Sequence, residues 1–292
     1  MKIGLIDVDS HNFPNLPLMK LATYHKKQGD TVEWCNALDT YDVVYQSKIF
    51  DFTPDFNFCL RADEVIKGGT GYDLENTLSD EVEHCCPDYS LYSTFNEAYG
   101  FLTRGCPRGC PFCIVAEKEG RRSVQVADLG EFYKGQKEIK LLDPNLLACK
   151  DREYLLDELS STKAYIDFTQ GLDIRMMTDS VADKLNRMKI KMIHFAWDNY
   201  EFETYEKLKY FRDLLHYDMR KLRVYVLVNF DTTHAQDLER IYKLRELDYD
   251  PYVMIYDKVH APKQTRYLQR WVNNKRIFRL TERFEEYDHR KG

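Results

Sequence analysis

A repeated alternation of short apolar stretches with longer amphipathic stretches constrains the fold of this chain most. The pattern predicts strands at 99–103, 138–142, 165–169, 192–196, 222–229 and 252–256, and helices at 152–159, 179–188, 201–215, 235–247 and 264–274. Strands that alternate with helices pair in parallel, because each helix returns the chain to the same end of the sheet. The sequence therefore predicts an α/β fold with a partial (β/α)6 TIM-like barrel.

Polar side chains follow several of these strands at their carboxyl ends. They are Asp143 and Asn145 after the second strand, Gln170, Asp173 and Arg175 after the third, and Asp198 after the fourth. The chemistry of a parallel barrel lies at this edge, so these residues are candidates for one site. The alternative for each is a helix cap or an ion pair at the barrel rim.

Three of the eight cysteines stand together directly after the first expected strand. Cys106, Cys110 and Cys113 have the spacing Cys-x3-Cys-x2-Cys, with no obvious fourth ligand. Three thiolates can hold a [4Fe-4S] cluster that keeps one iron open for a substrate or cofactor, whereas a cluster with four cysteines mostly carries electrons. Two alternatives are a zinc site, which usually takes four ligands, and an electron-transfer cluster with Cys149 as fourth ligand.

This cysteine loop, with an aromatic residue before its last cysteine and a βα array after it, resembles the radical S-adenosylmethionine superfamily. The resemblance covers roughly residues 99–256. It implies a [4Fe-4S] cluster held by Cys106, Cys110 and Cys113, with S-adenosylmethionine on the open iron. Reductive cleavage then releases a 5′-deoxyadenosyl radical, which abstracts a hydrogen atom from the substrate, while the protein positions and shields the reactants.

The resemblance also implies roles for residues of this loop and of the second strand end. Phe112 would contact the adenine. Family members often carry Gly-Gly-Glu after the second strand, where it meets the methionyl amine. This chain has Asp143-Pro-Asn145 there, so we expect Asp143 or Asn145 to make that contact, or the contact to be missing.

Later strand ends supply the remaining candidates for cofactor binding. Asp198 stands where the family often places an acid on the ribose hydroxyls. Gln170 and Asp173 are expected at the same mouth, and Arg175 suits a carboxylate of the cofactor or the substrate. No single residue is assigned as catalytic, because nothing in the sequence identifies the substrate.

Residues 1–95 loosely resemble the cobalamin-binding-type α/β domain that precedes the radical core in one branch of the superfamily. The likeness rests on residues 12–14, on the glycine-rich stretch 67–71 and on residues 168–175. The Asp-x-His-x-x-Gly pattern of cobalamin ligation is missing, since Asp9-Ser-His11 has no glycine three residues on. We therefore expect a small Rossmann-like domain without bound cobalamin.

The expected division of the chain is this domain at 1–95, the radical core at 96–262 and a basic, aromatic helical segment at 263–292. In the last segment arginines and lysines alternate with Tyr267, Trp271, Phe278 and Phe284. Basic residues with aromatics suit single-stranded nucleic acid. Equally, the aromatics of a helix can pack on the barrel while its charges face water, and we favour this packing.

The bulk composition narrows the class of protein. The net charge of −6 gives no support for broad binding of nucleic acid or of an anionic membrane. No apolar run reaches the ~18 residues of a membrane span, and the short charged start argues against a signal peptide, so we expect a cytoplasmic enzyme.

We expect two kinds of partner: an electron donor such as a flavodoxin or ferredoxin, and a small-molecule, peptide or RNA substrate. An iron–sulfur protein without S-adenosylmethionine chemistry and a cobalamin-dependent radical methyltransferase are the alternative functions.

Overall fold

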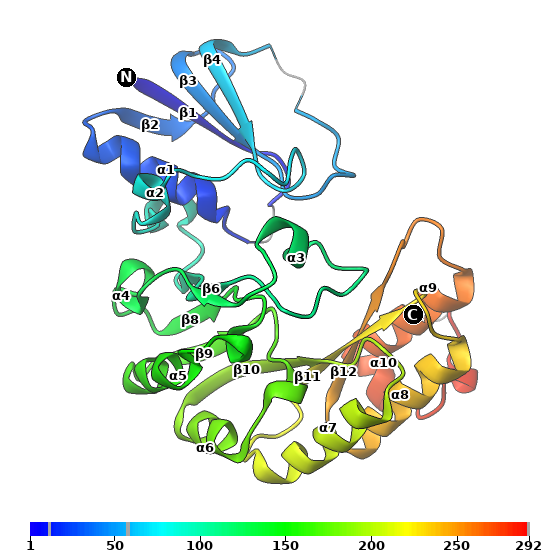
Figure 1. Cartoon of the computed structure of the whole chain (residues 1–292). Coiled ribbons are helices and arrows are strands. Elements are labelled where there is room, and N and C mark those ends of the chain that lie inside the picture. The colour runs from blue at the N-terminus through cyan, green and yellow to red at the C-terminus, as the bar shows by residue number, and fades with distance from the viewer. Residues whose placement is uncertain (11–12, 57–58, 291–292) are drawn as a thin grey trace. The chain divides into compact units, whose positions relative to one another are not determined.

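The chain forms two compact units in the computed structural model, which describes residues 1–10, 13–56 and 59–290 (Figure 1). The first unit comprises Met1–Gly100 and Ala127–Lys137, and the second comprises Phe101–Val126 and Glu138–Gly292. Both are built on parallel sheets with helices, as the α/β prediction requires. The described part of the segment expected at 263–292, residues 263–290, groups with the second unit. Across the described ranges, no helix has both the length and the apolar character needed to cross a membrane.

The first unit contains a four-stranded parallel sheet in the order β2-β1-β3-β4. Its strands are β1 (Lys2–Asp7), β2 (Thr31–Trp34), β3 (Thr40–Ser47) and β4 (Arg61–Gly68), and its helices are α1 (Leu16–Lys27), α2 (Asp80–Glu83), α4 (Leu129–Phe132) and the 3₁₀ turn Tyr89–Tyr92. Helix α1 begins where the Asn15 side chain accepts from the Leu18 N–H, with Pro17 in the first turn. This is the Rossmann-like arrangement that the sequence predicts.

Alternating side chains of β1 pack on opposite faces of this sheet. Ile3 and Leu5 pack with Leu18 of α1, and Ile6 packs with Val44. This is the period of two that a strand buried on both faces requires. His11, considered above as a cobalt ligand, lies outside the described residues.

The second unit contains strands β8 to β12, which pair in parallel in the order β12-β11-β10-β9-β8, whereas β5 belongs to the residues of the first unit. The bounds are β5 (Ala98–Gly100), β8 (Glu138–Leu141), β9 (Tyr165–Phe168), β10 (Lys189–Ala196), β11 (Leu222–Val228) and β12 (Asp250–Ile255). Five strands after the first agree with the predicted positions to within a few residues. The sheet follows the order of a partial (β/α)6 barrel.

The first predicted strand, 99–103, is interrupted. The chain forms β5 and then β6 (Thr103–Arg104), which pairs antiparallel with β7 (Val124–Gln125). The backbone N–H groups of Leu102 and Thr103 donate to the Asp143 carboxylate. These donors are therefore not available to a neighbouring strand, which is why the strand stops.

Helices follow the strands in the predicted order and lie along the outside of the sheet (Figure 1). They are α5 (Arg152–Ser161), α6 (Asp179–Arg187), α7 (Phe202–Leu214) and α8 (His234–Glu246), with α3 (Val115–Lys118) in the cysteine loop and 3₁₀ turns at Leu146–Ala148, Ile174–Met176 and Phe284–Glu286. Thr178 and Thr233 begin α6 and α8 by accepting from backbone N–H groups of the first turn.

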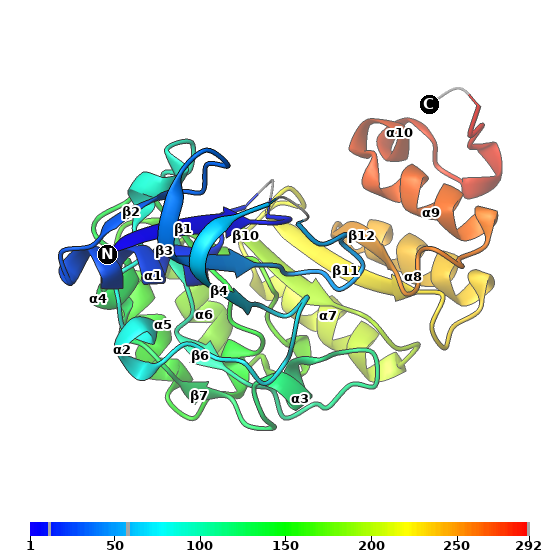
Figure 2. The same cartoon turned by 90° about the horizontal axis from the view of Figure 1, so that it is seen from above.

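The C-terminal helices α9 (Lys263–Asn273) and α10 (Lys275–Leu280) lie beside α8 and β12 (Figure 2). Trp271 is fully buried, and its ring contacts Phe278 and Tyr242. Trp271 and Phe278 thus pack inside the unit, in agreement with the packing alternative, while Tyr267 and Phe284 are partly buried.

Candidate functional site

The cysteine loop begins directly after β6 and is closed by backbone hydrogen bonds. The Cys106 N–H donates to the Gly120 carbonyl, and the Cys113 N–H donates to the Cys110 carbonyl. Arg104 forms an ion pair with Glu119 at 3.1 Å, at the other end of the loop. The three thiols are therefore carried by one closed loop.

Gly105 makes this closure possible. Its φ is +85°, a region that L side chains rarely adopt, and a Cβ built there would lie 2.1 Å from the Arg122 carbonyl oxygen. Gly109, between the first two cysteines, also has a positive φ of +56°. The loop therefore requires glycine at position 105 and favours it at position 109.

The three thiols lie at the surface of the second unit. Cys106 and Cys110 are partly buried and Cys113 is exposed. Burial raises the pKa of the Cys110 thiol, the nearby Asp198 carboxylate raises it further, and Arg175 opposes them. The site therefore includes Cys110, Asp198 and Arg175 as electrostatic neighbours.

The donor set suits a multi-iron cluster. Within the described ranges, no three His, Cys, Asp or Glu side chains converge on a point that could hold a single metal ion. A four-iron cluster takes one thiolate per iron, so its ligands need not converge on one point. Three accessible thiols lie on one loop whose shape depends on glycine. The Asn145 side chain, described below, places a hydrogen-bond donor near one of these thiols. This arrangement fits a four-iron cluster.

Asp173 ties this loop to the end of β9. Its side chain is only 6% exposed and accepts from Arg108 Nε at 2.6 Å and from Arg175 Nε at 2.8 Å. Burial alone would raise the pKa of Asp173, but Arg175 and Arg108 outweigh it and hold the pKa below its ordinary value. Because Arg108 lies between Cys106 and Cys110, the ionised carboxylate anchors the loop.

Asn145 reaches the same group from the end of β8. Its residue is 3% exposed, and Nδ2 lies 3.5 Å from Cys106 Sγ and 3.4 Å from Asp173 Oδ2. The side-chain oxygen of Asn145 is buried and has no hydrogen-bond partner in the described part of the chain. An unsatisfied buried acceptor is uncommon, and a bound group that donates to it would explain it.

Asp198 follows β10 and is held by a buried arginine of α8. Arg240 is fully buried, and it donates to the backbone carbonyls of Trp197, Asp198 and Leu227. Burial raises the pKa of Asp198 to about 6, while Arg240 and Arg175 oppose the rise. Arg240 thus joins the ends of β10 and β11 beneath the site.

Two of the predicted site residues, Asp143 and Gln170, lie in other surroundings. Asp143 is buried and accepts from the N–H groups of Leu102 and Thr103 and from the Thr103 hydroxyl. Burial raises its pKa to about 6, against the opposing effect of these donors. Gln170 is exposed at the end of β9. The prediction that they bind a cofactor stays a prediction.

The aromatic residue of the loop lies against two rings from other strand ends. Phe112 packs edge-on against Phe230 at 5.4 Å between ring centroids, and Phe230 packs likewise against Tyr256 at 4.9 Å. This row extends from the cysteine loop to the ends of β11 and β12. It offers an apolar surface beside the thiols.

Sequence reasoning missed Arg108, Phe230 and Arg240. The position of Arg108 inside the cysteine loop was an available signal. No sequence signal identified Arg240, because a single arginine in an amphipathic helix is usually exposed.

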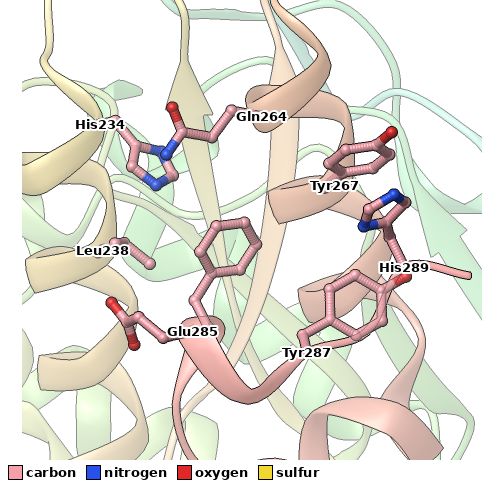
Figure 3. Close-up of a pocket in the computed structure, with 8 residues that line it drawn as sticks. His234, Leu238, Gln264, Tyr267, Glu285, Tyr287 and His289 are labelled. Atoms are coloured by element: carbon pink, nitrogen blue, oxygen red, sulfur yellow. The ribbon is translucent and has the colours of Figure 1, made fainter.

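A cavity of about 420 Å³ lies elsewhere in the second unit, between α8, α9 and the 3₁₀ turn Phe284–Glu286 (Figure 3). It is lined by rings and polar side chains that include His234, Tyr267 and Tyr287. Tyr267 stacks on His289 at 4.1 Å between ring centroids. None of the predicted site residues lines this cavity.

Comparison with known proteins finds solved structures that are similar to this chain. No protein-family model and no curated protein sequence matches the chain. Two solved structures of the radical S-adenosylmethionine methyltransferase TsrM from Kitasatospora setae match with a TM-score of 0.65 over 87% of this chain. One has cobalamin and a [4Fe-4S] cluster bound, at 11% identity and 74% coverage of its chain; the other has tryptophan substrate and aza-SAM bound, at 10% and 72%.

A third structure, SuiB of Streptococcus suis bound to S-adenosylmethionine, matches at 14% identity with a TM-score of 0.44. It covers 63% of this chain and 48% of its own.

Proposed function

We propose that this chain, which has the fold of radical S-adenosylmethionine enzymes, binds a [4Fe-4S] cluster through Cys106, Cys110 and Cys113 and cleaves S-adenosylmethionine reductively to abstract a hydrogen atom from a substrate. One observation carries the proposal. Strand-end residues predicted from sequence are neighbours of the cysteine loop: Asn145 contacts Cys106, and Arg175 is an electrostatic neighbour of Cys110.

The bound cluster would supply the electron for cleavage, and the residues around it would bind and orient the cofactor. The unsatisfied Asn145 oxygen suits the methionyl ammonium as its donor. Arg175 offers positive charge for a carboxylate. Asp198 suits the ribose hydroxyls. The Phe112 ring offers an apolar face to the adenine.

Of the two residues that replace Gly-Gly-Glu, Asn145 is the better candidate. The Asp143 oxygens already accept bonds from Leu102 and Thr103. The exposed position of Gln170 leaves it available to the substrate or the cofactor.

Anaerobic reconstitution with iron and sulfide tests the proposal. The native protein should bind about four irons and form 5′-deoxyadenosine from S-adenosylmethionine only when dithionite is present. Cys113→Ala should lose both, and Cys149→Ala, which alters a buried cysteine outside the loop, should keep both.

A native protein that holds iron but yields no 5′-deoxyadenosine would favour an iron–sulfur protein without this chemistry. Equal iron in Cys113→Ala and in the native protein would refute the assigned ligands.

A cobalamin-dependent methyltransferase is the second candidate, because one matching structure contains cobalamin. In the first unit, the polar side chains after β1 and β3 bind nearby groups of the same unit. Asn15 donates to Ser47, and Asp9 accepts from the N–H groups of Ile49 and Phe50. A retained absorbance band after incubation with hydroxocobalamin and desalting would favour this second candidate.

The proposal also implies partners and a compartment. Each cleavage consumes one electron, so a low-potential donor such as a flavodoxin or ferredoxin is required. The substrate would be a small molecule, a peptide or an RNA. All eight cysteines are free, which is typical of a reducing compartment such as the cytoplasm.

A further inference from the structure

Resting on the proposed function, we infer that Asn145 sets the reduction potential of the cluster by donating an N–H···S hydrogen bond to Cys106. In this role Asp173 is a positioning residue that holds the Asn145 amide in the orientation that donates. The inference concerns the reduction of the cluster, so it does not depend on the identity of the substrate.

The amide group of Asn145 has two N–H donors and two neighbouring acceptors. Nδ2 lies 3.5 Å from Cys106 Sγ and 3.4 Å from Asp173 Oδ2. Turning the amide by 180° would place its oxygen against a carboxylate and a sulfur, both of which are acceptors. The surroundings therefore fix which end of the amide faces the thiolate, so this assignment does not depend on telling nitrogen from oxygen.

Asp173 is itself held in place by two guanidinium groups. Arg108 Nε lies 2.6 Å from Oδ2 and Arg175 Nε lies 2.8 Å from Oδ1. The Arg175 backbone N–H also donates to Oδ1 at 3.1 Å. A carboxylate with this many fixed donors stays ionised and does not rotate freely, so it is a firm acceptor for the second N–H of Asn145.

The hydrogen bond to sulfur favours the reduced cluster. One electron from an external reductant enters the cluster, no covalent bond changes, and the thiolate sulfurs become more negative. A donor aimed at sulfur stabilises the reduced form more than the oxidised form, and hydrogen bonds to sulfur are among the factors that set cluster potentials. Asn145 is 3% exposed, and burial strengthens this electrostatic effect.

Loss of the Asn145 donor should therefore make the cluster harder to reduce. We expect the equilibrium constant for one-electron reduction to fall about tenfold, which is a shift of about 59 mV to more negative potential. The Asn145 amide would thus bind the cofactor through its oxygen and adjust the reduction potential of the cluster through its nitrogen.

The experiment is a redox titration of reconstituted protein without S-adenosylmethionine, followed by electron paramagnetic resonance of the reduced cluster. Asn145→Leu removes the amide at similar volume, and Asn145→Ala removes it without added bulk. Asp173→Asn keeps the Asn145 donor and removes a negative charge near the cluster, which favours reduction, so its midpoint potential should lie above that of Asn145→Leu. Asn186→Leu is the matched control, because the amide of Asn186 donates to the Leu214 carbonyl of α7, and its potential should equal that of the native protein.

An unchanged midpoint in an Asn145 variant that retains native iron and sulfide would overturn the inference. Loss of iron from both Asn145 variants would overturn it as well, because Asn145 would then hold the cluster rather than adjust it. Failure of the proposed function is distinguishable, since the native protein would then bind no cluster or yield no 5′-deoxyadenosine.

Discussion

Replacement of Arg240 by methionine tests whether the strand ends beneath the site depend on one buried cation. Arg240 is fully buried on α8 and forms an ion pair with Asp237 at 2.6 Å. It also donates to the carbonyls of Trp197 at 2.5 Å, Asp198 at 3.0 Å and Leu227 at 2.7 Å. Methionine fills much of the same space but offers no donor.

The expected loss of stability comes from the buried polar groups that lose their guanidinium partner in Arg240→Met. The Asp237 carboxylate, 5% exposed, would lose its guanidinium partner, and breaking a buried pair costs about 3–5 kcal/mol. Each buried carbonyl left without a donor adds about 1–3 kcal/mol unless water reaches it. Since water can enter at the site mouth, we expect a fall of about 4 kcal/mol in the unfolding free energy of the second unit.

The assay uses urea unfolding followed by tryptophan fluorescence in a Trp34→Phe background. The chain has three tryptophans, and Trp34 is the one in the first unit, so the signal then comes from Trp197 and Trp271 of the second unit. The unfolding free energy is obtained by linear extrapolation to water. This separates the second unit from the first, whose unfolding need not coincide with it.

The matched control is Arg220→Met, which breaks an exposed pair with Asp218 whose side chains are 75% and 48% exposed. Exposed pairs contribute about 0–1 kcal/mol, so this variant should unfold near the native midpoint. A loss below about 1 kcal/mol in Arg240→Met, or a loss equal to that of the control, would refute the argument.

Two further predictions concern the loop and a buried histidine. Gly105→Ala should lose most of the cluster iron after reconstitution, because the added Cβ would meet the Arg122 carbonyl at 2.1 Å. Gly120→Ala has a similarly unfavourable φ of +89° but its Cβ would meet nothing within 4 Å, so it should keep more iron than Gly105→Ala, and equal iron in both would contradict the steric argument. Burial lowers the pKa of His194 to about 4, below the ordinary value near 6.5 that it has when unfolded. The folded state then binds fewer protons than the unfolded state, so this contribution to stability is present above pH ~6.5 and is lost as pH falls toward 4. Between pH 7 and pH 5 the native protein should lose about 2 kcal/mol more unfolding free energy than His194→Gln, measured by the same urea assay, and parallel losses would show that His194 is not responsible.

Local patterns were sufficient to predict the helices and most strands. The predicted helix at 179–188 is α6 (Asp179–Arg187), and the predicted strand at 222–229 is β11 (Leu222–Val228). Apolar spacing and N-terminal caps such as Thr178 are properties of neighbouring residues, so they can be recognised without the fold. The prediction of one strand at 99–103 was inaccurate because the end of that strand depends on Asp143, about forty positions later. The Asp143 carboxylate accepts hydrogen bonds from the backbone N–H groups of Leu102 and Thr103.

The candidate site was predictable in part for the same reason. Because parallel strands end at one edge, the sequence indicated that Asn145, Asp173 and Arg175 belong near the cysteine loop. Arg108 meets Asp173 across 65 positions of sequence, and no local pattern identifies such a pair. The roles within the group, such as the anchoring of the loop by Asp173, depend on these distant contacts.

The sequence by itself determined the three cysteines, the alternation that makes an α/β fold and the strand ends that face one edge, because each depends on residue type and local spacing. Only the tertiary structure decided which polar residues meet. It buried Asp143 among backbone donors, directed the Asn145 nitrogen at Cys106 and placed Arg240 beneath Asp198. These pairings depend on how separate strands and helices pack, which brings together groups that are far apart along the chain.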